Sequence, residues 1–228
     1  LCKSKFTFAD EIDQIYDAIA VGTVSKAAKK PVFDTVQNLL GSGKSITTSA
    51  DIDDLCLKNL LLTRDASEIV VYQANPAPVL SNKTVFVYDD HNVLIERLVA
   101  DVLSGKPVIL ACDSVELANS VKKRLEKDGV SGVLSVTKDT SQKEEIQDFV
   151  ANVNDPEKGV KKLVLLIYTP SLQSGTSIDV PHFVKVYGVY HGQTTVDGFS
   201  QMLARDRQSS EFHVAFKKFG AIAAGGDQ

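Results

Sequence analysis

Segments with the apolar pattern of strands alternate along this chain with segments that have the pattern of helices, and this alternation limits the possible folds most strongly. In the second half, strands are expected at 107–112, 132–136, 163–168, 183–190 and 212–216, with helical patterns between them. The run 163–168 is apolar throughout, which is typical of a strand covered on both faces of a parallel sheet. The sequence therefore predicts an α/β protein with parallel sheets flanked by helices.

A proline-rich segment divides the chain into two expected domains. Before it, strands are expected at 3–10, 45–49 and 68–73, and helices at 12–19, from Pro31 to residue 40, and at 51–62. The segment 75–78 reads Asn-Pro-Ala-Pro, and it is followed by an expected strand at 84–88 and a helix from 89 to 103. Proline-rich segments are typical of linkers. We therefore expect one domain in residues 1–83 and a second in residues 84–228.

Composition excludes several classes of protein. Of the 228 residues, 43% are hydrophobic and 24% are charged, which is typical of a globular protein. The net charge of −4 means that a polyanion site must be a local patch. No apolar run approaches ~18–20 residues, so neither a membrane span nor a membrane partner is expected. Cys2, Cys56 and Cys112 are too dispersed for a disulfide framework or a zinc cluster, and they favour a reducing, intracellular setting.

Two segments of the first domain contain residues suited to nucleotide chemistry. Asp10 and Glu11 follow the first expected strand, and ligands of parallel sheets bind at the carboxyl ends of strands. An aspartate there can hold Mg²⁺ through water, and a neighbouring glutamate can orient an attacking water. The alternative is an acidic pair that stabilises a helix N-terminus. Ser49 and Asp51 follow the next strand and could link an acidic metal site to a neighbouring domain, or cap the following helix.

The run Gly41-Ser42-Gly43-Lys44-Ser45 looks like a phosphate-binding loop, but its context argues against that interpretation. The position that requires the first glycine of such a loop is Asn38. A phosphate loop also leads from a strand into a helix, whereas here the expected order is helix, loop and strand. We therefore interpret the run as a turn that ends a helix.

The second domain has two further candidate segments. The loop 169–179 is rich in hydroxyl residues and glycine, so it can offer backbone amides and short donors to phosphate oxygens. Its alternatives are an ordinary surface loop, or the phosphate loop of an unrelated nucleotide-sugar or phosphate-binding enzyme at 174–177. Residues 194–207 are expected to form a helix on which Gln201 and Arg205 share a face, from which the arginine could reach a phosphate. The alternative is a pair of solvated arginines.

Two capping boxes are expected at helix starts in the second domain. Asp113 with Glu116 is expected to cap the helix that follows the strand at 107–112, and Ser141 with Glu144 to cap the next one. The four histidines show no spacing typical of metal ligands, so they are interpreted as structural or surface residues.

The order of these motifs resembles that of superfamily 2 helicases. An Asp-Glu pair ends one strand, Ser-Ala-Asp at 49–51 follows the next, and a Ser-Gly-Thr-Ser loop at 174–177 precedes Gln-x-x-x-Arg-x-Arg at 201–207. This is similar to helicase motifs II, III, V and VI. The likeness is greatest to the herpesvirus origin-binding-protein helicases and to related plasmid and phage replication helicases. It implies RecA-like lobes, with the C-terminal part of the first lobe (motifs II and III) in 1–83 and a complete second lobe (motifs IV to VI) in 84–228.

The resemblance also implies cofactors, partners and residue roles. The implied cofactors are ATP and Mg²⁺, and the implied partners are single-stranded nucleic acid, expected to be DNA, and other replication proteins. Asp10 would coordinate Mg²⁺ and Glu11 would be the catalytic base. The other implied catalytic residues, which would face the γ-phosphate, are Gln201, Arg205 and Arg207. The residues implied in ATP binding and coupling are Ser49, Asp51, Gly175 and Thr176. The residues implied in nucleic-acid binding are Ser114, Thr169 and Ser174.

The chain departs from the helicase pattern in three places. Ala204 replaces the usual motif VI glycine, and Thr7 interrupts the apolar run before Asp10. No phosphate-binding loop precedes Asp10, and the family carries that loop upstream. Because the chain also begins at Leu1, without methionine, we interpret it as a fragment of a longer protein. The intact protein is then expected to hydrolyse ATP, whereas this chain alone is not.

The resemblance implies an ATP-dependent DNA helicase or translocase of DNA replication. It would act in the cytoplasm of a bacterial host, or in the host nucleus if the source is a eukaryotic virus. The alternative is a non-catalytic α/β module that binds nucleic acid or a protein partner.

Overall fold

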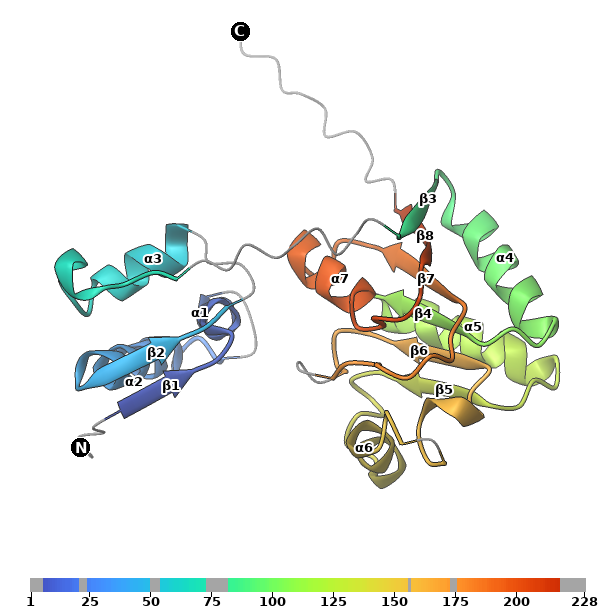
Figure 1. The fold of residues 1–228 in the computed structure, drawn as a ribbon, viewed down its shortest axis with the longest axis horizontal. Helices are drawn as coiled ribbons and strands as arrows, with labels where there is room; N and C mark the ends of the chain where they lie inside the picture. Colours follow the sequence, from blue (N-terminus) through green and yellow to red (C-terminus); the bar gives the residue numbers. More distant parts are fainter. Residues whose placement is uncertain are drawn as a thin grey trace, which may run out of the picture. The chain divides into compact units, whose positions relative to one another are not determined.

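A computed structural model describes residues 6–20, 24–49, 54–72, 82–155, 157–172 and 176–217 (Figure 1). The chain divides into two compact units, Leu1–Pro76 and Ala77–Gln228, whereas the sequence analysis places the domain boundary after residue 83. Each unit contains its own parallel sheet. Within the described ranges, no helix is both long and apolar enough to cross a membrane.

The first unit has a two-stranded parallel sheet in which β1 (Phe6–Ala9) pairs with β2 (Lys44–Thr47). The connection between the strands contains α1 (Ile12–Ala20) and α2 (Lys29–Gly41). The sheet is followed by α3 (Asp54–Leu61) and by the short 3₁₀ helix η1 (Ala66–Glu68). The expectation of a strand at 68–73 is therefore wrong for 68–72, because residue 68 ends η1 and residues 69–72 pair with no strand among the described residues.

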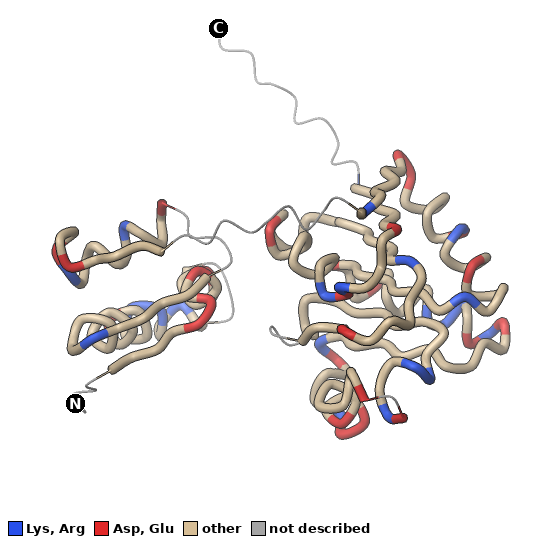
Figure 2. Tube along the Cα trace, viewed as in Figure 1, with Lys and Arg blue, Asp and Glu red and all other residues tan. Residues whose placement is uncertain are grey.

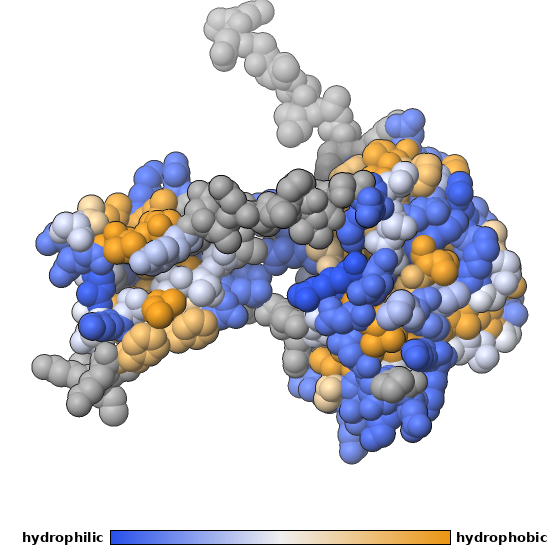
Figure 3. Space-filling model, viewed as in Figure 1, coloured by the Kyte–Doolittle hydropathy of each residue, from blue (hydrophilic) through white to orange (hydrophobic). Residues whose placement is uncertain are grey.

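The core of the first unit is small. The buried hydrophobic residues that the structure describes in this unit come from three helices and are Ile12, Tyr16, Ile19, Leu40 and Cys56. The face of the sheet that carries Phe6, Phe8 and Ile46 is exposed, and Figure 3 shows hydrophobic side chains along that strand edge. Helices thus cover one face of this sheet, whereas parallel sheets usually have both faces covered.

The second unit is built on a six-stranded parallel sheet with the order β3-β8-β7-β4-β6-β5. The strands are β3 (Thr84–Tyr88), β4 (Val108–Cys112), β5 (Val133–Val136), β6 (Leu165–Tyr168), β7 (Lys185–Tyr190) and β8 (Glu211–Phe216). The helices are α4 (His91–Leu103), α5 (Val115–Lys127), α6 (Glu144–Ala151), the short η2 (Val160–Lys162) and α7 (Val196–Leu203). These strands lie where the sequence analysis expects them, and the order confirms the predicted parallel α/β class.

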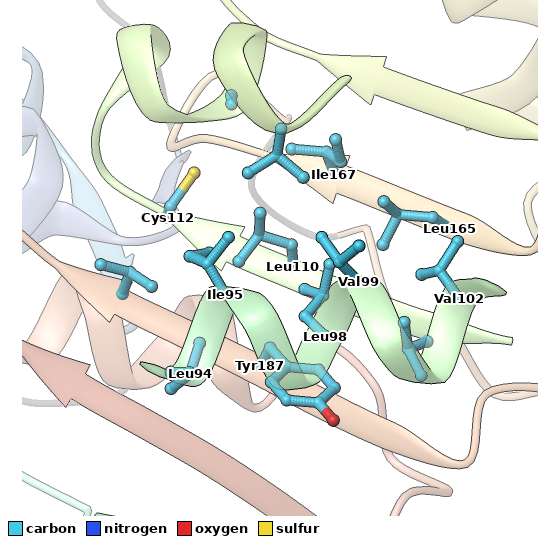
Figure 4. Close-up of a cluster of buried hydrophobic side chains, with 14 of the residues drawn as sticks. Leu94, Ile95, Leu98, Val99, Val102, Leu110, Cys112, Leu165, Ile167 and Tyr187 are labelled. Atoms are coloured by element: carbon cyan, nitrogen blue, oxygen red, sulfur yellow. The ribbon is translucent and has the colours of Figure 1, made fainter. Parts of the chain in front are cut away.

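Alternate residues of the central strands fill two separate cores. Leu110, Leu165 and Tyr187 point to the face covered by α4 and α5, as Figure 4 shows for the α4 side. Ile109, Leu166 and their neighbours point to the opposite face, against α6 and α7. Every residue of β4 and β6 is buried, as expected for strands enclosed on both faces.

Gly188 in β7 sets how closely α7 approaches the sheet. A Cβ atom at this position would lie 2.6 Å from Cδ2 of Leu203 and 3.0 Å from the ring of Phe199, both in α7. The first of these distances is too short for non-bonded carbon atoms and the second is tight, so any other residue would require the side chains of Leu203 and Phe199 to shift.

A buried aspartate of α4 contacts three donors, two of which belong to β7. Asp101 accepts hydrogen bonds from Lys106 (2.7 Å) and from the hydroxyl of Tyr187 (2.6 Å), and its second oxygen lies 3.0 Å from Nζ of Lys185. Burial acts to raise the pKa of Asp101, but these hydrogen bonds outweigh it and hold the pKa below its ordinary value. Because the pKa is lower in the folded state, the carboxylate contributes stability above about pH 4 that is lost as the pH falls.

We expect Asp101→Asn to lower the free energy of unfolding by about 2–4 kcal/mol, because the two lysines lose their buried counter-ion. Thermal unfolding followed by circular dichroism at pH 7 and at pH 3 measures the effect. The variant should lose less stability between these pH values than the parent chain. Asp139→Asn, which removes a carboxylate from an exposed turn, is the matched control and should leave both midpoints unchanged. Equal losses in the two variants would contradict the assignment.

Candidate functional site

The carboxyl ends of β1 and β2 bring acidic and hydroxyl side chains together. Asp10 follows β1, and its Oδ1 accepts hydrogen bonds from the Thr48 hydroxyl and from the backbone N–H of Glu11 (3.1 Å). The Ser49 hydroxyl donates to Oδ1 of Asp13 in α1 (2.6 Å). Figure 2 shows the acidic residues gathered at the start of α1. The contacts of Thr48 and Asp13 are additional to the predicted site residues.

Glu11 adopts a backbone conformation that is unusual for a residue with a side chain. Its φ is +50°, in the left-handed region, which costs about 1 kcal/mol for a non-glycine residue. Two hydrogen bonds fix the turn, from Ile12 N–H to the carbonyl of Thr48 (3.0 Å) and from Thr48 N–H to the carbonyl of Ala9 (2.9 Å). Backbone strain that neighbouring contacts maintain in this way is frequent at functional sites.

The Asp10 side chain suits a Mg²⁺ ion that is shared with a ligand. Its Oδ2 accepts no hydrogen bond from the residues that the structure describes, and the side chain is exposed. The same residues contain no group of three histidine, cysteine, aspartate or glutamate side chains that could hold a metal. Mg²⁺ keeps several waters and usually takes one or two carboxylates together with substrate phosphates. The donor set therefore fits a phosphate-bound ion and not an ion enclosed by protein.

The glycine-rich run at 41–45 is a turn, as expected. It leads from the end of α2 at Gly41 to the start of β2 at Lys44, which confirms the order of helix, turn and strand. Asp51, Ser174 and Gly175, three of the predicted site residues, lie outside the described residues.

In the second unit the structure brings the two candidate segments together. Ile178 and Asp206 form a parallel bridge, in which Ile178 N–H donates to the carbonyl of Arg205 (2.8 Å) and Arg207 N–H donates to the carbonyl of Ile178 (3.2 Å). The segment that follows β6 is therefore joined by backbone hydrogen bonds to the segment that follows α7. The sequence analysis treats these segments separately and contains no signal for the bridge.

Arg205 is not on a helix, which corrects the expectation of a helix over 194–207. The helix α7 ends at Leu203, and its last turn is fixed from the sheet, because the Tyr168 hydroxyl donates to the carbonyl of Met202 (2.8 Å). The guanidinium of Arg205 donates to the carbonyls of Leu172 (3.3 Å) and Thr176 (3.1 Å). Arg205 therefore does not share a helix face with Gln201, and it supports the loop after β6.

Arg207 has the most accessible side chain of the three predicted γ-phosphate residues. It is exposed and lies 3.4 Å from a carboxylate oxygen of Asp179, a pair that contributes little stability at the surface. Gln201 is partly buried in α7. Figure 2 shows that the lysines and arginines of the second unit are spread over several elements.

The start of α5 differs from the predicted capping box. Ser114, and not Asp113, caps the helix, since its hydroxyl accepts from Leu117 N–H (3.3 Å). The buried carboxylate of Asp113 instead accepts from the backbone N–H groups of His191 (2.7 Å) and Gln193 (2.7 Å). Asp113 thus ties the end of β4 to the loop after β7. The sequence does not distinguish an aspartate that caps the following helix from one that accepts hydrogen bonds from a distant loop.

Two more predictions concern local contacts in this unit. The helix α6 begins after Lys143 without a side-chain cap, and the Ser141 hydroxyl donates to the carbonyl of Lys138, so the second capping box is wrong. Thr169, a predicted nucleic-acid contact, is buried, and its N–H and hydroxyl both donate to the carbonyl of Val136.

Burial raises the pKa of the Cys112 thiol, at the end of β4, to about 12, which makes the thiol unreactive.

The two roles at the start of α5 can be separated by hydrogen exchange. We expect Ser114→Ala to cost about 1 kcal/mol and to accelerate amide exchange at Leu117. Asp113→Ala should accelerate exchange at His191 and Gln193 and cost more stability, because two backbone N–H groups lose a buried carboxylate acceptor. The measurement is native-state amide exchange by NMR. Faster exchange at Leu117 in Asp113→Ala, without a change at His191, would restore the original capping assignment.

With this geometry established, the chain can be compared with known proteins. The sequence matches no family model and no curated protein. Its fold is similar to that of Saccharomyces cerevisiae Dbp5 bound to RNA and ADP BeF3, with a TM-score of 0.62 and 13% identity over 96% of this chain and 55% of that one. It is also similar to Mycobacterium smegmatis helicase Lhr bound to single-stranded DNA and AMP-PNP, with a TM-score of 0.59 and 17% identity over 93% of this chain.

The chain is shorter than both neighbours, since it spans about half of the Dbp5 chain and 28% of the Lhr chain. At these levels of identity the likeness concerns the fold. The six-stranded parallel sheet with its flanking helices matches the fold of RecA-like helicase domains.

Proposed function

We propose that this chain is part of an ATP-dependent nucleic-acid helicase or translocase, and that the intact protein couples ATP hydrolysis to movement on single-stranded nucleic acid. The observation that carries the proposal is the junction of the two segments of the second unit, where Ile178 pairs with Asp206 and Arg205 holds the preceding loop. The fold shared with Dbp5 and Lhr supports it, because both of those structures hold a nucleotide or nucleotide analogue together with a nucleic acid.

The proposed roles of the first unit follow from its carboxylates. Asp10 would hold Mg²⁺ through its carboxylate, and the ion would neutralise charge on the phosphates of ATP. Glu11, positioned by the strained turn, would accept a proton from the attacking water. Thr48 keeps one oxygen of Asp10 in place, so we assign it a positioning role.

In the second unit, the two candidate arginines are proposed to have different roles. Arg207 is exposed, so it can reach a phosphate without breaking more than a surface ion pair. Arg205 already donates to two backbone carbonyls, so it would act on the phosphate and also support the loop that contains Thr176. Electrostatic stabilisation of phosphoryl transfer by such groups is worth several kcal/mol in related chemistry.

The finer part of the proposal comes from the sequence motifs. Their likeness to the herpesvirus origin-binding-protein helicases and to plasmid and phage replication helicases leads us to propose DNA as the nucleic acid and replication as the process. The two fold neighbours differ in the nucleic acid that they bind, which is RNA for Dbp5 and single-stranded DNA for Lhr. The choice between DNA and RNA is therefore part of the experiment.

The test is ATP hydrolysis by the intact parent protein, with and without single-stranded DNA or RNA of matched length. We expect stimulation by DNA, and we expect Glu11→Gln to remove turnover while retaining nucleotide binding. Arg207→Ala should reduce turnover by about 10³-fold or more, by analogy with the loss of an arginine finger. Arg124→Ala, which removes an arginine paired with Glu96 on the surface of the second unit, is the charge-matched control and should retain full activity.

Arg205→Ala has a second expected effect, because its guanidinium contacts the loop. Turnover should fall, and amide exchange at Thr176 and Ile178 should increase, whereas Arg207→Ala should leave this exchange unchanged. Binding of single-stranded DNA without any turnover in the intact protein would overturn the motor function and favour a non-catalytic nucleic-acid module.

A further inference from the structure

The two edges of the six-stranded sheet differ in how well they are protected. At one edge, β5 ends in Ser135 and Val136, which are buried. At the other edge, β3 exposes 58% of Val85, 44% of Phe86 and 68% of Val87. Figure 3 shows hydrophobic side chains gathered over this part of the second unit. The sequence of β3, Thr-Val-Phe-Val-Tyr, has none of the lysine, proline or inward charge that usually blocks an edge strand.

The backbone of β3 leaves alternate residues available for pairing. Thr84 N–H donates to the carbonyl of Ser210 (2.7 Å), at the start of the ladder with β8. In a strand, the direction of the backbone groups alternates from residue to residue. Phe86 and Tyr88 therefore direct their backbone groups toward β8, and Val85 and Val87 direct theirs to the open edge.

The side chains along this edge are arranged symmetrically about Phe86, with valines on either side of it and residues of opposite charge at the two ends. Lys83, Val85, Val87 and Asp89 alternate onto one face of the strand. Nζ of Lys83 lies 4.8 Å from the centroid of the Phe212 ring, so its ammonium group is held on the α7 side of the sheet. A second strand of the same sequence, running antiparallel and centred on Phe86, would place each charge opposite its complement and each valine opposite a valine.

We propose that β3 is a self-association edge, which pairs antiparallel with β3 of a second copy of this chain about a two-fold axis at Phe86. Val85 then exchanges both backbone hydrogen bonds with the partner's Val87, and Lys83 faces the partner's Asp89. The two Phe86 residues form the closely spaced pair that lies between hydrogen-bonded pairs of an antiparallel ladder. The interface is isologous, so the assembly closes as a dimer.

The ring of Phe86 is already ordered for this contact. It stacks on His213 in β8 with the centroids 4.9 Å apart and the planes 13° apart, and His213 stacks in turn on Tyr187 in β7 (4.9 Å, 18°). The His213 ring is fixed by the Tyr88 hydroxyl (2.8 Å) and by Glu211 (2.6 Å). Because the aromatic ladder holds Phe86 before association, little side-chain entropy is lost when the dimer forms.

The charge pattern favours a second copy over an unrelated strand, because a partner of any other sequence would have to reproduce the same order of charges at the same spacing. A five-residue edge buries less area than the ~1,200 Å² of a standard stable interface, so the dimer is expected to be weak and to depend on concentration. The inference does not depend on nucleotide chemistry, and it adds to the proposed function without resting on it.

Sedimentation equilibrium of the 228-residue chain tests the proposal, at concentrations from about 1 μM to about 500 μM. We expect a monomer–dimer equilibrium that Val87→Lys weakens by roughly tenfold or more, because the substitution places an ammonium group among apolar residues of the interface. Val93→Lys is the matched control, since it adds the same charge at a valine of α4 that is 57% exposed. It should leave the dimer unchanged.

Charge reversal tests the register. Asp89→Lys places an ammonium group opposite the partner's Lys83 and should weaken the dimer, and Lys83→Glu should weaken it by placing a carboxylate opposite the partner's Asp89. The double variant restores opposite charges and should recover most of the affinity. Amide exchange supplies an independent readout, because the N–H groups of Val85 and Val87 should gain protection only at high concentration.

A chain that is monomeric over the whole concentration range would overturn the proposal. So would a dimer that Val87→Lys leaves unchanged, a double variant no better than the single ones, or open-ended association in place of a closed dimer. None of these outcomes bears on ATP hydrolysis, so the proposal fails or stands separately from the proposed function.

Discussion

Complete burial of β4 and β6 is the constraint on which the second unit depends. A parallel strand whose side chains are buried on both faces needs a hydrogen-bonded neighbour on each side and helices above and below. The sheet order and the two cores satisfy both needs. The same constraint positions the candidate site, since Asp113 and the loop that begins at Thr169 come directly after these two strands and must lie at one edge of the sheet.

The first unit is held together differently. Among its described residues, the sheet has two strands and five hydrophobic residues are buried, so apolar packing contributes less than in the second unit. Polar contacts supply part of the order, through the pairs of Thr48 with Asp10 and Ser49 with Asp13. The side chains with the most chemical interest are therefore also structural, and a substitution there alters the backbone of the site together with its chemistry.

The sequence predicts the parts of the fold that local patterns determine. Buried strands such as 163–168 are visible because every residue is apolar, and helices are visible from their periodicity. The segment 68–73 has the composition of a strand, but composition does not reveal whether a neighbouring strand is available to pair with it. Similarly, the sequence predicts a functional role for Arg205 but does not predict its contacts. Those contacts depend on residues distant in sequence, because the Tyr168 hydroxyl of β6 helps to fix the end of α7 and Ile178 forms the backbone bridge with Asp206.

At Gly188 the space between β7 and the side chains of α7 is too small for a methyl group. The atoms of α7 that fill the space belong to Phe199 and Leu203, and the chain beyond that helix leads directly to Arg205. Alanine at this position, which adds one carbon, would require the side chains of Phe199 and Leu203 to shift in the helix that leads to Arg205. A position in the middle of the sheet, with no functional group of its own, therefore limits which side chains α7 can pack against the sheet one turn before the candidate segment.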